Sequence, residues 1–179
     1  MLNIIQDRNL KRVVLIISIT ICAISANGQK YSVGEKAPNI VLNAPDGKEI
    51  KLSSLRGQMV LIDFWASWCA PCRKENPYIV QAYQKYKDVV FKNGNGFTIF
   101  SVSLDMNQKA WEMAIQKDNM EWPAHVSDLK GWKGKAAELY DIQSIPASYL
   151  IDGEGRIVAV NVRGSELDAK LRKYKKGVF

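Results

Sequence analysis

The stretch MVLIDFWASWCAPC, residues 59–72, decides how this chain folds. Residues 59–66 are almost continuously apolar, which is typical of a strand that is covered on both faces of a sheet. After the second cysteine, apolar side chains recur at helical spacing at Tyr78, Ile79, Ala82, Tyr83 and Tyr86. The sequence therefore predicts a central strand followed by a helix, with Cys69 and Cys72 where the one becomes the other.

The position of these two cysteines indicates redox chemistry. A helix N-terminus presents unpaired backbone N–H groups and about half a positive charge, which together favour a thiolate over a thiol. Cys69 lies first in the chain and is predicted to be the nucleophile. Cys72 follows three residues later, within the short Cβ–Cβ distance that a disulfide requires, and is predicted to be the resolving thiol.

Two alternatives to redox chemistry remain for the cysteine pair. A structural zinc site needs about four ligands, and the only further cysteine and histidine are Cys22 and His125. A purely structural disulfide would close so short a loop that it would constrain the unfolded chain little. We expect no metal site and no cofactor. His125, beside Trp122-Pro123, is expected to be structural, and Met106, Met113 and Met120 are not expected to bind metal.

The first 28 residues have the pattern of a secretory signal peptide. Arg8, Lys11 and Arg12 precede an uncharged run over 13–26, and Ala26-Asn27-Gly28 fits a cleavage site after Gly28. We therefore expect residues 29–179 to form one exported, periplasmic domain. The periplasm is also a compartment in which protein disulfides form and are exchanged.

Two other roles for this leader are the alternatives. The fourteen uncharged residues of 13–26 are fewer than the roughly 20 that span a bilayer, which argues against a membrane anchor. Lipid attachment at Cys22 is disfavoured because Ile21 stands where bacterial lipoproteins generally have a small residue.

Length and charge agree with a single domain that has a substantial core. Removing Asp7, Arg8, Lys11 and Arg12 with the leader takes 25 basic and 18 acidic residues to 22 and 17, so the net charge falls from +7 to +5. The basic residues at 172–176 are expected to form a solvated helix face and not a nucleic-acid site. A disulfide-stapled scaffold would carry more than one cysteine pair.

The remaining pattern predicts an α/β domain. We expect a hairpin of 40–42 and 49–52 around the turn Pro45-Asp46-Gly47, a helix over 71–90 that stops at 93–96, and a second core strand at 97–104. A helix around 111–115, a hairpin of 148–152 and 157–162, and a closing helix over 165–176 follow. This order predicts a mixed central sheet with helices on both faces, which is the thioredoxin arrangement.

Residues 60–77, VLIDFWASWCAPCRKENP, resemble the active-site segment of TlpA/ResA-type thiol-disulfide oxidoreductases of the thioredoxin-like superfamily. The similarity extends to 34–38, 52–57, 145–146, 150–152 and 163–164, and so spans nearly the whole exported part. The resemblance implies a thioredoxin fold with an added N-terminal β-hairpin and a helical insertion at about 105–128, after the second core strand. It also implies protein thiols or disulfides as substrates, and an electron-donor thiol protein that can be membrane-bound. We expect a monomer.

The resemblance also assigns roles to particular residues. Asp63 matches the buried aspartate of thioredoxin, whose pKa burial should raise and which can accept a proton from Cys72. Glu75 matches a glutamate to which ResA-type proteins give the same role. The alternative for Glu75 is a solvated carboxylate that the helix dipole stabilises. The sequence does not decide which acid is the acceptor.

A second group of residues is implied in substrate binding. Pro146 resembles the cis-proline that faces the cysteine pair, whereas the sequence alone would favour an ordinary trans-proline loop. Trp68, Pro71 and Ile145 are expected to join Pro146 in the substrate-binding surface. Trp65 is expected to help shield the sulfurs, with plain core packing as its alternative.

The residues between and around the cysteines favour a protein-disulfide reductase. Ala70-Pro71 lacks the histidine found in strong oxidants, and Ile145 resembles the residue before the cis-proline in reducing thioredoxins. One alternative is a peroxiredoxin-like thiol peroxidase, although Ala66-Ser67-Trp68 replaces the Pro and Thr or Ser that precede its cysteine. The other is a non-catalytic binding module.

Overall fold

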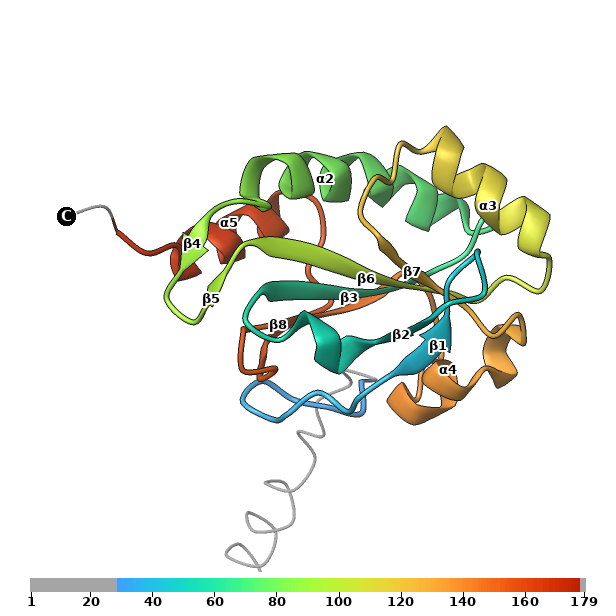
Figure 1. Cartoon of the computed structure of the whole chain (residues 1–179), viewed down its shortest axis with the longest axis horizontal. Coiled ribbons are helices and arrows are strands. Elements are labelled where there is room, and N and C mark those ends of the chain that lie inside the picture. Colours follow the sequence, from blue (N-terminus) through green and yellow to red (C-terminus); the bar gives the residue numbers. More distant parts are fainter. Residues whose placement is uncertain (1–28, 178–179) are drawn as a thin grey trace, which may run out of the picture.

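The computed structural model describes residues 29–177, so the predicted signal peptide and Cys22 lie outside the described residues (Figure 1). The centre of the molecule is a five-stranded sheet with the order β7-β6-β3-β8-β9. Its strands are β3 (Met59–Trp65), β6 (Phe97–Ser103), β7 (Ala124–Val126), β8 (Ala147–Ile151) and β9 (Ile157–Val160). β3, β6 and β7 run parallel, and β8 and β9 are antiparallel to their neighbours, so the predicted mixed sheet is confirmed.

β3 is the central strand that its apolar run predicts. All seven of its side chains are buried, because β6 and β8 flank it and helices cover both of its faces. Val60 to Phe64 pair with Ile151 to Ala147 of β8. This register brings the start of β8 beside the end of β3, where the cysteine pair follows.

Helices lie on both faces of the sheet, as the sequence predicts (Figure 1). Helices α2 (Ala70–Tyr86) and α5 (Ser165–Tyr174) pack against each other on one face. There, Leu61 of β3 lines a cavity with Ile79 of α2 and Leu167 of α5. On the opposite face, the ring of Phe64 lies 5.4 Å from that of Tyr140 in α4 (Lys135–Tyr140). Successive side chains of β3 point to opposite faces of the sheet, so they pack alternately against the α2/α5 layer and the α4 layer.

The N-terminal hairpin is confirmed as a separate two-stranded sheet of β1 (Val41–Asn43) and β2 (Glu49–Lys51). The turn closes where Pro45-Asp46-Gly47 predicts it, since Ala44 O accepts the N–H of Gly47 at 2.9 Å. A short 3₁₀ helix, η1 (Leu52–Leu55), leads from this hairpin towards β3.

The helix after the cysteines was predicted to reach Val90, which is wrong: α2 ends at Tyr86. The chain instead forms a small hairpin of β4 (Val90–Phe91) and β5 (Gly94–Asn95). Gly96 has a φ of 87°, and a Cβ there would lie 2.5 Å from Lys87 O. The returning chain thus packs directly against the end of α2, an approach that only glycine allows.

The predicted insertion at 105–128 contains a helix, and also a strand that the sequence did not predict. Asn107 caps α3 (Gln108–Lys117) by accepting the N–H of Ala110 at 2.9 Å. The chain then forms the edge strand β7, the short helix η2 (Gly131–Lys133) and α4. Strand β7 and helix α4 have three and six residues, too few for a periodic apolar pattern to reveal. β9 also ends two residues early, at Val160, before Asn161 with its φ of 51°.

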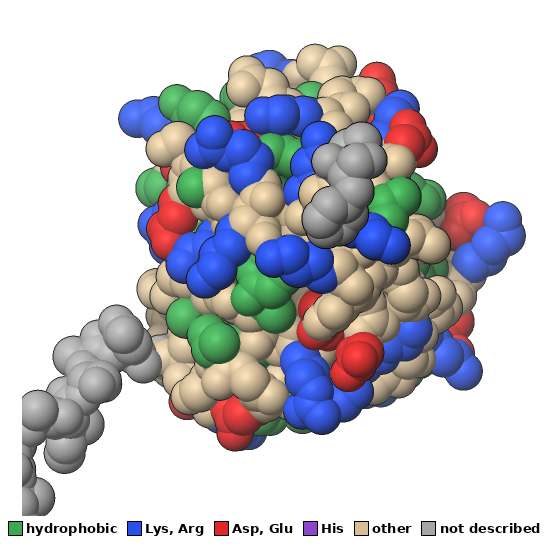
Figure 2. Space-filling model, turned by 90° about the vertical axis from the view of Figure 1, so that its left-hand side faces the viewer, with side chains coloured by type: hydrophobic (Ala, Val, Ile, Leu, Met, Phe, Trp, Pro, Cys, Tyr) green, Lys and Arg blue, Asp and Glu red, His purple; other side chains and the backbone are tan. Residues whose placement is uncertain are grey.

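Positive charge is widespread at the end of the molecule where β4 and α5 lie, and Figure 2 shows this face. Part of it is neutralised locally, because Asp168 on α5 lies 3.2 Å from Arg172 and 2.6 Å from Lys85. Within residues 29–177, no helix is both long and apolar enough to cross a membrane.

Candidate active site

Cys69 and Cys72 form a disulfide at the junction of β3 and α2, with their Cα atoms 5.3 Å apart. Cys69 is the N-cap residue of α2, and its Sγ accepts the backbone N–H of Cys72 at 3.2 Å. The first turn of α2 contains no acidic residue. The Cys69 sulfur therefore lies in the positive field of a helix N-terminus and receives one of its unpaired N–H groups, an environment that stabilises a thiolate.

The surroundings of the two cysteines differ. Cys72 is 1% exposed and belongs to the buried side of α2, whereas Cys69 is 5% exposed. Around them, Trp68, Ala70 and Pro71 are exposed, and Trp68 shows 56% of its surface. Approach from solvent is thus at the Cys69 end of the pair. Trp65 is fully buried and belongs to the core, in line with the packing alternative.

Asp105, at the end of β6, holds the loop that carries the nucleophile. Its carboxylate accepts the backbone N–H of Ser67 at 2.9 Å, the hydroxyl of Ser67 at 2.5 Å and the hydroxyl of Ser103 at 2.7 Å. Asp105 is 1% exposed, and these bonds satisfy a carboxylate that would otherwise be costly to bury. Sequence reasoning did not assign it a role, because the partners are thirty-eight residues apart.

Arg73 fixes the other side of the same loop. Its Nη1 donates to Ser67 O at 3.1 Å, and its Nε and Nη2 bind both oxygens of Asp118, just past the end of α3. Asn76 donates a further hydrogen bond of 2.7 Å to Asp118. This bidentate pair ties the first turns of α2 to α3. Sequence reasoning missed it as well, since Arg73 looks like any polar residue of an amphipathic helix.

Asp63 and Glu75, the two candidate proton acceptors, line one small cavity under the redox helix, together with Pro146, Arg163 and Gly164. The cavity has a volume of about 10 Å³, which is about the space that one water molecule needs. Asp63 is buried, and its Oδ2 has no hydrogen-bond partner in the part of the chain that the structure describes. Glu75 is half-buried, and its Oε2 accepts the N–H of Gly164 at 2.9 Å. Glu75 is thus not simply a solvated helix carboxylate.

Burial raises the pKa of Asp63 to about 7. Desolvation is the main cause, the negative charge of Glu75 raises the pKa further, and the positive charge of Arg163 lowers it. A carboxyl with a pKa near neutrality can both accept and return a proton at physiological pH. Asp63 lies on the face of β3 that α2 covers, and Cys72 belongs to the buried side of α2.

The peptide bond between Ile145 and Pro146 is cis, as the resemblance implied. Pro146 directly precedes β8, whose Ala147 pairs with Phe64 of β3. Arg163 donates a hydrogen bond to Pro146 O. Ile145 and Pro146 are each half-buried, so part of this loop is accessible beside the end of β3. The role of Arg163 had no signal in the sequence beyond its place in the Arg163-Gly164 match.

His125 is buried in the core beside Trp122. Its ring stacks on Trp122 at 5.3 Å, its Nε2 lies 3.1 Å from Met120 O, and burial lowers its pKa to about 4. Among residues 29–177, no group of three His, Cys, Asp or Glu side chains could hold a metal ion.

Comparisons with known proteins place this geometry among thiol-disulfide enzymes. The sequence profile described as the AhpC/TSA family matches residues 33–160. The chain is 31% identical over 153 residues to the thiol-disulfide oxidoreductase ResA of Bacillus anthracis, covering 86% of this chain and 82% of that protein. It is 30% identical over 152 residues to ResA of Bacillus subtilis (strain 168), covering 85% and 79%.

Solved structures agree with these sequence matches. The thioredoxin domain of a thiol-disulfide oxidoreductase from Bacteroides vulgatus is 35% identical, with a TM-score of 0.72 over 82% of this chain and 99% of that one. A thiol:disulfide interchange protein from Bacteroides sp. is also 35% identical, with a TM-score of 0.72 over 82% and 92%. The sheet order described above is thus that of the thioredoxin fold.

Proposed function

Because the chain belongs to the AhpC/TSA family and, within it, to the ResA-type thiol-disulfide oxidoreductases, we propose that it is an exported protein-disulfide reductase that uses a Cys69/Cys72 dithiol-disulfide cycle. The observation that carries this proposal is the position of Cys69. Its sulfur caps α2, receives the N–H of Cys72, and lies at the more accessible end of the pair.

The cycle starts from the reduced enzyme. The Cys69 thiolate attacks one sulfur of a substrate disulfide, the other substrate sulfur leaves and takes up a proton, and a mixed disulfide forms. Cys72 then loses its proton and attacks Cys69 Sγ, which releases the second substrate thiol and leaves the enzyme disulfide. The substrate gains two electrons and two protons. A donor dithiol then restores the enzyme by the same exchange in reverse.

Asp63 is the proton acceptor that we favour for Cys72. It is buried beneath α2, and its Oδ2 has no hydrogen-bond partner among the described residues. Its pKa of about 7 suits proton transfer at neutral pH. Glu75 has one oxygen engaged by the N–H of Gly164. Its negative charge raises the pKa of Asp63, so we assign it the role of setting the basicity of Asp63.

The direction and the location of the reaction rest on the sequence. Ala70-Pro71 between the cysteines and Ile145 before the cis-proline favour the reducing direction. The leader pattern of residues 1–28 favours export to the periplasm, where the electrons would come from a thiol protein that can be membrane-bound. We expect a monomer, with Trp68, Pro71, Ile145 and Pro146 contacting the substrate.

Trapping with single-cysteine variants tests the cycle. Reduced Cys72→Ser, mixed with insulin, is expected to accumulate a mixed disulfide through Cys69 and to show no turnover, while Cys69→Ser traps nothing. Mass spectrometry of the trapped species identifies the sulfur that attacked. Full biological function of Cys69→Ser would instead indicate a binding module. Peroxide consumption that survives Cys72→Ser would indicate a thiol peroxidase.

A further inference from the structure

Two tryptophan rings stand exposed next to the redox pair. Trp68 directly precedes Cys69 and is 56% exposed, and Trp132, in η2, is 45% exposed. Their ring centroids lie 6.3 Å apart at an interplanar angle of 52°. The two come from segments sixty-four residues apart, so the fold brings a second large aromatic surface to the disulfide that the sequence motif does not contain.

Met106 extends this surface. It is 77% exposed, and it lies against Gly131, where an added Cβ would come within 3.4 Å of Met106 Cγ and 3.5 Å of its Sδ. Gly131 directly precedes Trp132, so Met106 lies against the segment that carries Trp132. We call Trp68, Trp132 and Met106 the apolar platform. Single exposed apolar residues are ordinary, but adjacent exposed tryptophans and methionine are typical of a binding surface.

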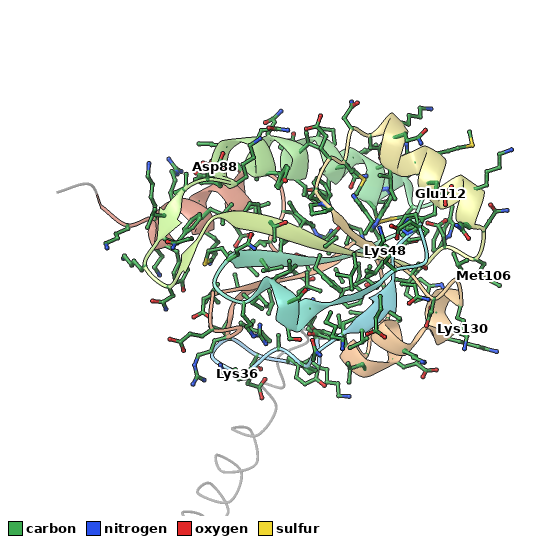
Figure 3. All side chains as sticks on the ribbon, in the orientation of Figure 1. Lys36, Lys48, Asp88, Met106, Glu112 and Lys130 are labelled. Atoms are coloured by element: carbon green, nitrogen blue, oxygen red, sulfur yellow. A yellow bond between two sulfur atoms is a disulfide. The ribbon has the colours of Figure 1, made fainter. Side chains whose placement is uncertain are left out.

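The exposed side chains on either side of Trp132 in the sequence are two lysines. Asp105 is buried and bonded to Ser67, and Asp128 accepts the backbone N–H groups of Lys130 and Lys135, so these acids are engaged within the fold. Lys130 and Lys133, on either side of Trp132, are exposed, and neither forms a salt bridge within residues 29–177. Figure 3 shows Lys130 and Met106 at the same end of the molecule.

We propose that the apolar platform selects the reductase's substrates by binding the residues that flank their cysteine. The occupant is an extended protein segment with an aromatic or long aliphatic residue next to the cysteine and an acidic residue close by. Trp68 and Trp132 bind the apolar side chain, and Lys130 and Lys133 attract the acidic one. This proposal rests on the proposed function, because it places the segment where its disulfide meets Cys69.

The shape of the surface favours a polypeptide over a small disulfide. Trp68, Trp132 and Met106 are between 45% and 77% exposed, so they form an open surface and not an enclosing pocket. Small ligands are usually held in concave sites that bury most of their surface. An open apolar surface suits a chain that binds along it and whose cysteine is accessible, as in an unfolded substrate.

The test compares Trp132→Ala and Trp132→Phe with Val90→Ala, which shortens an apolar side chain that is 50% exposed on β4, at the opposite end of the molecule (Figure 1). The peptide substrates are disulfide-linked and carry either Phe or Gly beside the cysteine (the Phe and Gly peptides). Two residues further they carry either Glu or Gln (the Glu and Gln peptides). The small substrate is 2-hydroxyethyl disulfide. Binding of the Phe peptide with Ser in place of its cysteine, followed by tryptophan fluorescence, gives a second readout that needs no thiol chemistry.

Trp132→Ala is expected to lower kcat/KM for the Phe peptide about tenfold, which corresponds to about 1.4 kcal/mol, and to weaken binding of the Ser-substituted peptide similarly. Rates with the Gly peptide and the small disulfide should stay within about twofold, as should every rate of Val90→Ala. Trp132→Phe should retain most of the preference for the Phe peptide over the Gly peptide. Raising salt from about 0.02 M to about 0.5 M should slow the Glu peptide more than the Gln peptide.

Other outcomes separate the two proposals. A wild-type protein that reduces 2-hydroxyethyl disulfide but neither binds nor prefers the Phe peptide would overturn the platform and leave the reductase intact. One that binds the Phe peptide through Trp132 but exchanges no disulfide would overturn the reductase and leave the platform. Equal losses of Trp132→Ala with all substrates, or a dimer in sedimentation that Trp132→Ala abolishes, would also overturn the platform.

Discussion

Asp63 and Glu75 line the same small cavity beneath the redox helix, although one comes from the central strand and the other from α2. Within residues 29–177, Glu75 accepts a hydrogen bond from the backbone of Gly164, whereas Asp63 Oδ2 has no hydrogen-bond partner. The negative charge of Glu75 raises the pKa of Asp63, and the positive charge of Arg163 lowers it. The sequence could not show whether Asp63 or Glu75 accepts the proton of Cys72, but the two carboxyl groups have different hydrogen-bond partners and charged neighbours in the fold.

Opposite charge changes around Asp63 should move its pKa in opposite directions. Glu75→Gln keeps an acceptor for Gly164 but removes a negative charge, so the pKa of Asp63 should fall below about 7. Arg163→Gln removes a positive charge, so the same pKa should rise. Titration of the Asp63 carboxyl carbon by NMR in the oxidised protein measures both. Identical titrations in the wild type and both variants would show that desolvation alone sets the pKa.

Asp63→Asn should slow the release of substrate from the mixed disulfide. The amide cannot take the proton of Cys72, and general-base catalysis typically contributes about 10²- to 10⁴-fold. The wild-type release rate should rise through about pH 7 as Asp63 ionises, whereas the release rate of the variant should show no such rise at that pH. Stopped-flow measurement on preformed mixed disulfide isolates this step. A larger effect of Glu75→Gln than of Asp63→Asn would assign the proton to Glu75.

Asp63 should also make the protein less stable as the pH rises. Its ordinary pKa is 3.8 and its folded-state pKa is about 7, so between these values the folded protein retains a proton that the unfolded chain has lost. The free energy of unfolding therefore falls from about pH 4 to about pH 7. Asp63→Asn removes this dependence and should be more stable above about pH 7, by at most about 4 kcal/mol. Urea unfolding of the oxidised proteins across this pH range measures the difference in stability between Asp63→Asn and the wild type. This difference should disappear at about pH 4.

The hydrogen bonds of Ser67 should stabilise both the fold and the reactive loop. Ser67→Ala removes one donor from buried Asp105 and should lower the free energy of unfolding by about 1 to 3 kcal/mol. Ser54→Ala is the matched control, because its hydroxyl bonds to Lys51 O at the exposed surface and its loss should cost less than about 0.5 kcal/mol. The rate at which iodoacetamide alkylates Cys69 in the reduced protein should change in Ser67→Ala and not in Ser54→Ala. Equal stability of the two variants would contradict this role.

The ion pair of Arg73 with Asp118 should matter more than an exposed pair. Within residues 29–177, Asp118→Ala leaves the partly buried guanidinium of Arg73 with the Ser67 carbonyl as its one hydrogen-bond acceptor, and it should destabilise the protein by about 1 to 3 kcal/mol. Asp46→Ala breaks the pair with Lys48, whose side chains are 54% and 83% exposed, and should change stability little. Chemical unfolding of both variants compares them directly. A small effect of Asp118→Ala would show that α3 is held in place by its apolar contacts alone.

Elements with a strong local pattern were predicted close to their observed bounds. β3 could be read from its nearly continuous apolar run, and the hairpins could be read from the turns at Pro45-Asp46-Gly47 and Gly153-Glu154-Gly155. The end of α2 was misplaced, because the helix stops where Gly96 returns against Lys87, a contact that the helical pattern of 71–90 does not contain. β7 and α4 were missed because a few residues carry no periodic signal.

The redox pair, the strand and helix that hold it, and Asp63 as a candidate proton acceptor could all be predicted from the sequence. They depend on residue type and on neighbours within one or two turns. The groups that surround these residues became known from the folded chain. Packing brings Glu75 and Arg163 to Asp63, Asp105 to Ser67, and Trp132 to Trp68, the neighbour of Cys69. The pKa of a carboxyl and the shape of a binding surface depend on groups that are close in space, and chain packing alone sets those distances.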